Sequence, residues 1–191
     1  MIKDTPKKLN NLLKIISLLT VIIYLYYRNY GKVILALMTF ILTFYDYLAL
    51  KLFKIKFNNS NKISITLFIF LSQYLGSCLD FYEKFSWWDI KLHFTSGILI
   101  FYVGLDIYNQ IYKSKRVIPK LLFATLFALS LANIWEIMEF IFDGTLHMDT
   151  QRAGNLVGRF ALEDTMTDLI VSTLGTFLAS IVNYFKLRKQ V

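Results

Sequence analysis

Six long apolar runs dominate the chain and decide what it can fold into. Each run has about 20 residues and few charges, which is the length that an α-helix needs to cross the hydrocarbon core of a bilayer. A hydrophobic content of 56% is typical of a polytopic membrane protein rather than of a soluble domain. We therefore predict an all-α, polytopic membrane helix bundle with about six transmembrane helices in a single transmembrane domain, residues 1–191. The predicted spans are Leu9–Tyr27, Val33–Leu50, Ile63–Phe81, Leu92–Tyr108, Leu121–Phe142 and Thr165–Phe185.

The basic residues are distributed as a membrane topology signal. The net charge is +8, but the 21 Lys and Arg residues lie at the ends of the apolar runs instead of forming one basic domain, so we expect no nucleic-acid partner. Most of them fall on one face when the helices alternate in direction, and the positive-inside rule makes that face, with both termini, cytoplasmic. The basic residues on the opposite face are Arg28, Lys32, Lys84, Lys91, Arg152 and Arg159.

Two further features concern processing and redox chemistry. The Lys-rich start before the first apolar run resembles a signal peptide, but residues 24–30 offer no small-residue cleavage site, so we interpret the run as a retained span. Cys78 is the one cysteine, which excludes an intramolecular disulfide and a thiolate cluster.

Three helix-spaced pairs of ionisable residues stand inside or at the edge of apolar runs. A charge at bilayer depth costs roughly 2.5 to 3.5 kcal/mol, so such residues usually bind or pair with something. Residues three or four apart share a helix face, and alternating helix directions place all three pairs in the extracytoplasmic half of the bundle. We therefore predict one shared site. Its candidate residues are Asp89 with His93, Glu136 with Glu139, and Asp164 with Asp168.

Other residues lie close to this predicted site. Asp80 and Asp143 fall at the same end of the bundle, and His147 lies in the long connection between Asp143 and Asp164. Asn133, one turn before Glu136, is a candidate to orient a carboxylate, whereas packing is the simpler role for Trp135. Trp87 and Trp88, just before the fourth run, are typical of the outer aromatic belt.

Clustered carboxylates with one imidazole are typical metal ligands. Oxygen ligands suit Mg²⁺, Mn²⁺ or Ca²⁺, and a nitrogen from His93 adds Zn²⁺ or iron. All six paired residues are therefore candidate ligands of a divalent metal ion, with His93 or Glu139 as the general base. The alternative is an ion-pair network, in which basic residues on the same face neutralise the acids. These are Lys91, Arg152 and Arg159.

At these residues the sequence resembles the YjdF-like family of bacterial inner-membrane proteins. The blocks that carry the resemblance are Trp88–Phe94 followed by Gly97, Trp135–Phe140, and Asp164–Leu169 with Gly175. They resemble the family's W/Y-D-x-x-x-H-F, W-E-I-x-E-W/F and D-T-x-x-D-M/L segments, over roughly Asp80 to Gly175. The resemblance implies a multi-pass protein of a bacterial cell membrane but names no reaction.

Three functions remain open from the sequence. The first is a metal-dependent membrane enzyme, a hydrolase or transferase that acts on a lipid or a phosphorylated lipid. The second is a transporter or sensor that binds a divalent cation or protons, although the inward half of the spans offers no ionisable pair to continue a path. The third is a structural membrane protein whose acids form ion pairs. The sequence does not indicate the oligomeric state.

Overall fold

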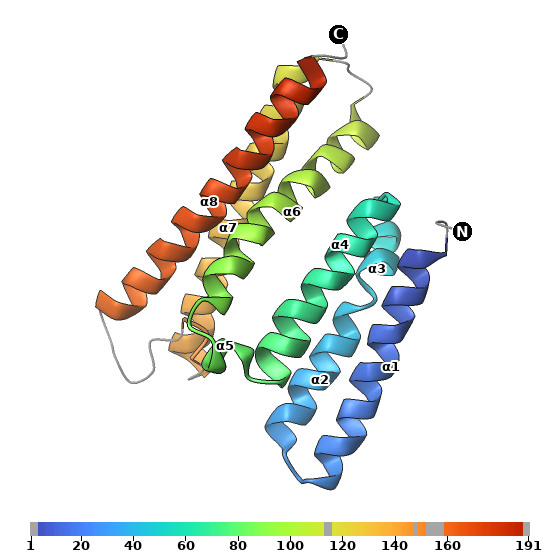
Figure 1. The fold of residues 1–191 in the computed structure, drawn as a ribbon, viewed down its shortest axis with the longest axis vertical. Coiled ribbons are helices and arrows are strands. Elements are labelled where there is room, and N and C mark those ends of the chain that lie inside the picture. Colours follow the sequence, from blue (N-terminus) through green and yellow to red (C-terminus); the bar gives the residue numbers. More distant parts are fainter. Residues whose placement is uncertain (1–3, 113–115, 147–148, 152–158, 189–191) are drawn as a thin grey trace. The chain divides into compact units, whose positions relative to one another are not determined.

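The computed structural model describes residues 4–112, 116–146, 149–151 and 159–188. Every regular element in these ranges is a helix, which confirms the predicted all-α fold (Figure 1). The chain divides into two compact units, residues 1–88 and 89–191, and each is described by itself. The single domain that the sequence suggests over residues 1–191 stays a prediction.

The first unit consists of helices that start at recognisable caps. Asn29 caps α2 by accepting a hydrogen bond from the Lys32 amide at 3.2 Å, and Asn58 caps α4 by accepting one from the Asn61 amide at 2.9 Å. Pro6 stands in the first turn of α1, where its missing N–H costs nothing. The helices of this unit are α1 (Thr5–Tyr26), α2 (Tyr30–Leu42), α3 (Tyr45–Phe53), α4 (Asn59–Ile69), the π-helix η1 (Phe70–Cys78) and α5 (Phe81–Lys84).

Polar side chains from α1 and α2 hold the π-helix in place. Tyr24 donates a hydrogen bond to the Cys78 carbonyl at 3.1 Å, and Lys32 Nζ donates one to the Ser77 carbonyl at 2.8 Å. Lys32 also forms an ion pair with Asp80, which has a left-handed backbone with φ of 61°. A π-helix is tolerated when its carbonyls find other donors. These side chains therefore stabilise the wider turn of η1.

The second unit is a bundle of three long helices, α6 (Trp88–Ile111), α7 (Val117–Leu146) and α8 (Arg159–Arg188). Gly104 brings α6 close to α7, since a Cβ there would lie 3.0 Å from Ala124 Cα. Asn183 Nδ2 on α8 donates to the Tyr102 hydroxyl of α6 at 3.0 Å. Small residues fill much of the core, as expected where close packing holds helices together in lipid. The buried cluster is Phe101, Leu105, Leu121, Ala124, Ala128 and Ala179.

Two glycines place α6 and α8 in backbone contact. A Cβ at Gly97 would overlap the Ser172 carbonyl oxygen, and a Cβ at Gly175 would overlap the Phe94 carbonyl oxygen. Thr176 Oγ1 donates across the contact to the Gly97 carbonyl at 3.3 Å. Neither glycine sits in a left-handed conformation, so each is needed for the space it leaves rather than for its backbone freedom.

Four helices are long and apolar enough to cross a membrane: α1, α6, α7 and α8, within the ranges that the structure describes. The count rises to five if α2 and α3, which are bent by 52° relative to each other, form one broken span. The predicted third span, Ile63–Phe81, is built from α4 and η1, of 11 and 9 residues, neither of which reaches span length alone. A multi-pass helical membrane protein is confirmed, whereas the number six stays a prediction.

The connection between the last two spans differs from the prediction. The sequence suggests a loop from Asp143 to Asp164, but α7 continues to Leu146 and α8 begins at Arg159. Polar residues at a helix end do not stop the helix, because water or neighbouring side chains can satisfy them. Asp164 and Asp168 consequently lie within α8, and Asp168 is about 14 Å from the helix start at 1.5 Å per residue.

Candidate functional site

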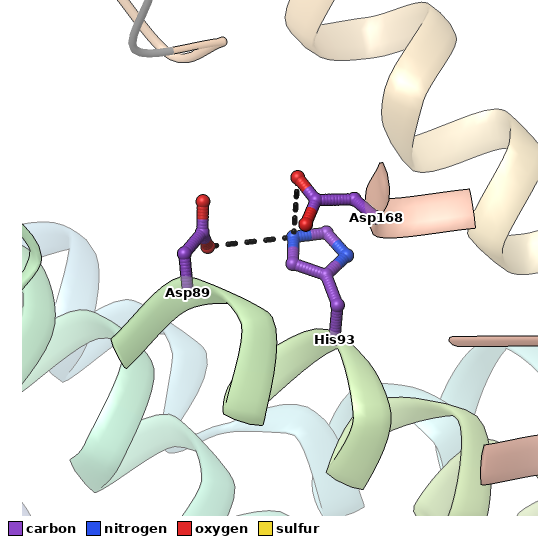
Figure 2. Close-up of side chains that lie close together, drawn as sticks. All are labelled: Asp89, His93 and Asp168. Carbon is purple, nitrogen blue, oxygen red and sulfur yellow. Dashed lines mark ion pairs between the residues drawn. The ribbon is translucent and has the colours of Figure 1, made fainter. Parts of the chain in front are cut away.

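The His93 imidazole lies among three carboxylates that come from three different helices. Its Nε2 is 3.5 Å from Asp89 Oδ1 on its own helix α6 and 3.6 Å from Asp168 Oδ2 on α8. Its Nδ1 is 3.6 Å from Glu136 Oε1 on α7. Figure 2 shows the Asp89 and Asp168 carboxylates reaching the same ring nitrogen from two helices. The structure thus brings together four of the six residues that the sequence predicts for one site, and we call them the carboxylate–histidine site.

Two of these acids are deeply buried. Glu136 is 4% exposed and Asp168 is 2% exposed. Glu136 Oε2 and Asp168 Oδ2 have no hydrogen-bond partner among the described residues. A buried carboxylate oxygen that lacks such a partner is costly, so these two acids call for a nearby positive charge or donor, which a protonated His93, a bound cation or a ligand can supply.

The oxygens of Asp89 and Asp168 and one His93 nitrogen all lie within 4.8 Å of one another. Ligands of a tetrahedral ion at roughly 2.0 to 2.1 Å are about 3.3 to 3.4 Å apart, close to the two separations from His93 Nε2. A set of one nitrogen and two oxygens suits Zn²⁺, Mn²⁺ or Fe²⁺ better than Mg²⁺ or Ca²⁺, which favour oxygen ligands alone. The donor types and the two separations from His93 Nε2 are therefore compatible with a divalent cation, and metal binding itself stays a prediction.

Glu136 occupies a different place from the other two acids, since it faces Nδ1 of His93 rather than Nε2. A histidine that binds a metal through one nitrogen usually donates its other N–H to a carboxylate, which fixes the tautomer and the ring orientation. The position of Glu136 matches that orienting role. The i, i+4 spacing of Asp89 and His93 places both side chains on one face of α6, which brings Asp89 next to Nε2.

Glu139 is buried beside this group and is fixed by a tryptophan. Trp135 Nε1 donates a hydrogen bond to Glu139 Oε1 at 2.8 Å, one helical turn away on α7. The charge of Glu139 interacts with those of Glu136 and His93. The charge of Asp164 interacts with those of Glu136 and Asp168. Trp135 therefore positions an acid, a role beyond the packing that the sequence suggests. The i, i+4 spacing to Glu139 could have indicated it.

Asp143 binds backbone instead of joining the carboxylate–histidine site. Its Oδ1 accepts hydrogen bonds from the Thr150 amide at 2.7 Å and from Thr150 Oγ1 at 2.6 Å, and its Oδ2 accepts one from the Gln151 amide at 2.9 Å. The buried Gln151 side chain then donates to Thr165 Oγ1 on α8 at 2.8 Å. Asp143 thereby ties residues 149–151 back onto α7, next to the turn of α8 that carries Asp164. No sequence pattern marks Gln151, because its buried state depends on this tertiary contact.

Asp143→Ala should loosen residues 149–151. The variant removes three hydrogen bonds to one carboxylate, each worth about 1.5 to 3 kcal/mol when the acceptor is charged. We expect amide hydrogen exchange at Thr150 and Gln151 to accelerate by at least about tenfold. Thr145→Ala is the matched control, since its hydroxyl bonds only the Ile141 carbonyl of its own helix among the contacts that the structure describes. Equal exchange in both variants would contradict the anchoring role of Asp143.

Several other predicted residues lie elsewhere. Asn133 donates to the Leu129 carbonyl of its own helix at 2.8 Å and is exposed, so the structure gives no support for its orienting a carboxylate. Asp80 belongs to the first unit and pairs with Lys32. His147 and Arg152 lie outside the described residues, as does the side chain of Arg159. Cys78 is buried and its thiol is free.

Comparisons with known proteins agree with the membrane fold. The family described as "Predicted membrane protein (DUF2238)" matches residues 9–189, almost the whole chain. A Thermotoga maritima protein described as "Uncharacterized protein" is 32% identical over 127 residues. That alignment covers 65% of this chain and 62% of the relative, so the chain spans less than two thirds of the relative's length. No solved structure matches. Neither description uses the narrower YjdF-like designation that the sequence blocks suggest.

Proposed function

Since this chain belongs to the DUF2238 family of membrane proteins, we propose that its carboxylate–histidine site binds a divalent metal ion and serves a membrane enzyme that acts on a phosphorylated lipid. The observation that carries the proposal is the convergence of Asp89, His93 and Asp168 from two helices, with donor atoms at separations that suit one cation. The YjdF-like assignment and a place in the cell membrane of a bacterium are part of this proposal.

Each residue of the site has a role that follows from its position. Asp89 and Asp168 would hold the cation with one oxygen each, and His93 would hold it through Nε2. Glu136 Oε1 lies 3.6 Å from Nδ1, and in the metal-bound site it would approach to accept the Nδ1 proton and hold the ring in the tautomer that leaves Nε2 free to coordinate. Asp164, one turn before Asp168, adds negative charge to the site. The candidate metals are Mg²⁺, Mn²⁺, Ca²⁺, Zn²⁺ and iron. A bound metal ion would polarise a phosphoryl oxygen and lower the pKa of a bound water.

Glu139 is the general base in this proposal. His93 cannot accept a proton at Nε2 while that nitrogen coordinates a cation, and Nδ1 faces Glu136. Glu139 is buried close by, and the hydrogen bond from Trp135 to its Oε1 leaves Oε2 to take a proton. Glu139, hydrogen-bonded to Trp135, is thus a different acid from those proposed to hold the metal, and it is the one assigned as base.

The depth of the site favours a lipid substrate. Asp89 and His93 lie in the first two turns of α6, which Trp88 begins, and Asp168 lies about 14 Å into α8. With α6 and α8 crossing the bilayer as proposed, we infer that this depth lies between the headgroups and the upper acyl chains, where a lipid phosphate can arrive without leaving the bilayer.

Contact between α6 and α8 weighs against the transporter alternative. Gly97 lies one turn after His93, and Ser172 lies one turn after Asp168. A Cβ at Gly97 would overlap the Ser172 carbonyl, so these two helices leave no room for an ion directly beyond the site. A close helix contact directly beyond the site suits binding and turnover better than passage across the membrane.

Release of inorganic phosphate tests the proposed activity. The protein is placed in nanodiscs that contain phosphatidic acid, and Mg²⁺, Mn²⁺ or Zn²⁺ is added in separate assays. We expect metal-dependent release, which Glu139→Gln reduces by roughly 100-fold or more while metal binding persists, because general-base catalysis contributes about 10² to 10⁴. Asn133→Ala, on the same helix but exposed, should keep full activity. Equal rates for Glu139→Gln and the unmodified chain would refute the assigned base.

A further inference from the structure

The first unit contains a sharp change of helix direction between α2 and α3. The two helices differ by 52°, and the break falls at Thr43 and Phe44. Asn10 Nδ2 on α1 donates to the Thr43 carbonyl at 2.9 Å, and Lys14 Nζ lies 4.3 Å from the centre of the Phe44 ring. The bend is therefore held by side chains of α1, which satisfy the carbonyl that it frees from the helix.

The position of the bend shows how deep α3 lies. Asn10 is close to the start of α1 at Thr5, so about one turn of that helix, with Lys7 and Lys8, extends beyond the level of the bend. A straight continuation of α2 through nine residues would advance about 14 Å, whereas a helix tilted by 52° advances only about 8 Å. Over its length α3 therefore moves more sideways than outward, compared with a straight continuation of α2.

The start of α3 is fixed to the first turns of α4 at the same level. The Tyr45 hydroxyl donates to the Lys62 carbonyl at 2.8 Å and lies 3.1 Å from Thr66 Oγ1. Asp46 forms an ion pair with Lys62 at 2.7 Å. These contacts attach one side of α3 to the protein and leave the rest of the helix facing outward.

The outward surface of α3 combines apolar and basic side chains. No residue of the helix is buried, and its apolar residues include Leu52 and Phe53, which are 63% and 70% exposed. Lys51 Nζ lies 5.5 Å from the Tyr47 ring, and a left-handed Lys54 ends the helix. Exposed lysines on and beside this helix are Lys7, Lys8, Lys51, Lys54 and Lys56.

We propose that α3 lies along the cytoplasmic membrane surface, with its leucines and Phe53 in the headgroup boundary and its lysines on anionic phospholipid headgroups. Basic clusters immediately beside membrane helices bind anionic lipids, and interfacial helices sit about 5 to 10 Å into that boundary. The short α2 fits this arrangement. Its 13 residues span about 20 Å, less than the hydrocarbon core, and an embedded α3 shortens the distance that α2 must cover.

The test measures the depth of α3 with a fluorophore. A Cys78→Ser chain carrying Phe53→Cys is labelled with NBD and placed in nanodiscs of phosphatidylcholine with phosphatidylglycerol, containing quenchers either at the headgroup or deep in the acyl chain. We expect the headgroup quencher to be the more effective at Phe53→Cys, and the deep quencher at Met38→Cys on α2, where the native side chain is 46% exposed. Stronger deep quenching at position 53 would show a continued span, and no quenching would show a helix in water; either result overturns the proposal.

The lipid charge is tested by a second pair of variants in the labelled chain. The double variant Lys51→Gln, Lys54→Gln should lower headgroup quenching in phosphatidylglycerol discs and leave it unchanged in phosphatidylcholine discs. In phosphatidylglycerol discs, the ratio of membrane-bound to unbound α3 should fall roughly fivefold for each lysine removed. Arg28→Gln with Lys84→Gln removes the same charge at the other end of the unit and should have no effect. Equal quenching in all three chains would refute recognition of anionic headgroups.

Discussion

Gly97→Ala should cost the second unit about 3 kcal/mol or more in its free energy of unfolding. A Cβ at this position would overlap the Ser172 carbonyl oxygen and would lie 3.0 Å from the Thr176 backbone nitrogen. Both obstacles are backbone atoms of α8 that cannot rotate away, so α6 and α8 must separate and lose the contacts between them. Unfolding by SDS titration of the detergent-purified protein, followed by circular dichroism, measures the loss.

Two companion variants make this prediction specific. Gly144→Ala meets nothing within 4 Å, so it should be neutral or up to about 1 kcal/mol stabilising, as expected of alanine in a helix. Gly175→Ala should be as harmful as Gly97→Ala, because its Cβ would overlap the Phe94 carbonyl oxygen. The double variant should lose less unfolding free energy than the two single variants lose together, because helices that have already separated leave room for the second methyl group. A Gly97→Ala chain as stable as Gly144→Ala would contradict the close helix contact.

Asp168→Asn should lower the affinity for Zn²⁺ or Mn²⁺ by more than about 100-fold. The side chain is 2% exposed, and its Oδ2 lies 3.6 Å from His93 Nε2, so the substitution removes the proposed ligand at nearly constant volume. Glu136→Gln should have a smaller effect of about 10- to 100-fold, because the role proposed for Glu136 is to orient His93 and not to bind the metal itself. Equilibrium dialysis of the protein in nanodiscs against each metal gives both affinities.

The order of these two effects distinguishes a metal site from an ion-pair network. If His93 is simply the cation among the carboxylates, then loss of Asp168 or Glu136 changes stability and leaves metal binding at a background level. Asp168→Asn should keep the chain folded without metal, since one fewer like charge in a buried cluster relieves repulsion. Asp106→Asn on α6 serves as the matched control and should leave affinity unchanged. A larger loss for Glu136→Gln than for Asp168→Asn would reverse the roles assigned here.

Much of the carboxylate–histidine site is predictable from spacing alone. The i, i+4 step places Asp89 and His93 on one face, and alternating helix directions bring the ends of α6, α7 and α8 together. The structure confirms that Asp89, His93, Glu136 and Asp168 meet. Their roles as ligands, base or orienting group stay predictions, because spacing fixes where side chains lie and does not fix what they bind.

The features that the sequence does not reveal depend on contacts between distant residues. The bend after Thr43 is stabilised by Asn10, 33 positions earlier, and no Gly or Pro marks it. The π-helix η1 depends on Tyr24 and Lys32 reaching its carbonyls. Hydropathy averages over each of these breaks, so it predicts continuous spans where the structure has a bent pair and a mixed α- and π-helix.

The proposed metal site is tested most directly by the metal content of detergent-purified protein, measured by inductively coupled plasma mass spectrometry for the unmodified chain, His93→Ala and Asn133→Ala. We predict close to one equivalent of a transition metal in the unmodified chain and in Asn133→Ala, and almost none in His93→Ala, with all three chains equally helical. Metal-free protein after supplementation with Zn²⁺, Mn²⁺ and Fe²⁺, or equal metal in His93→Ala, would contradict the site. The group of acids around His93 would then be a structural ion-pair network.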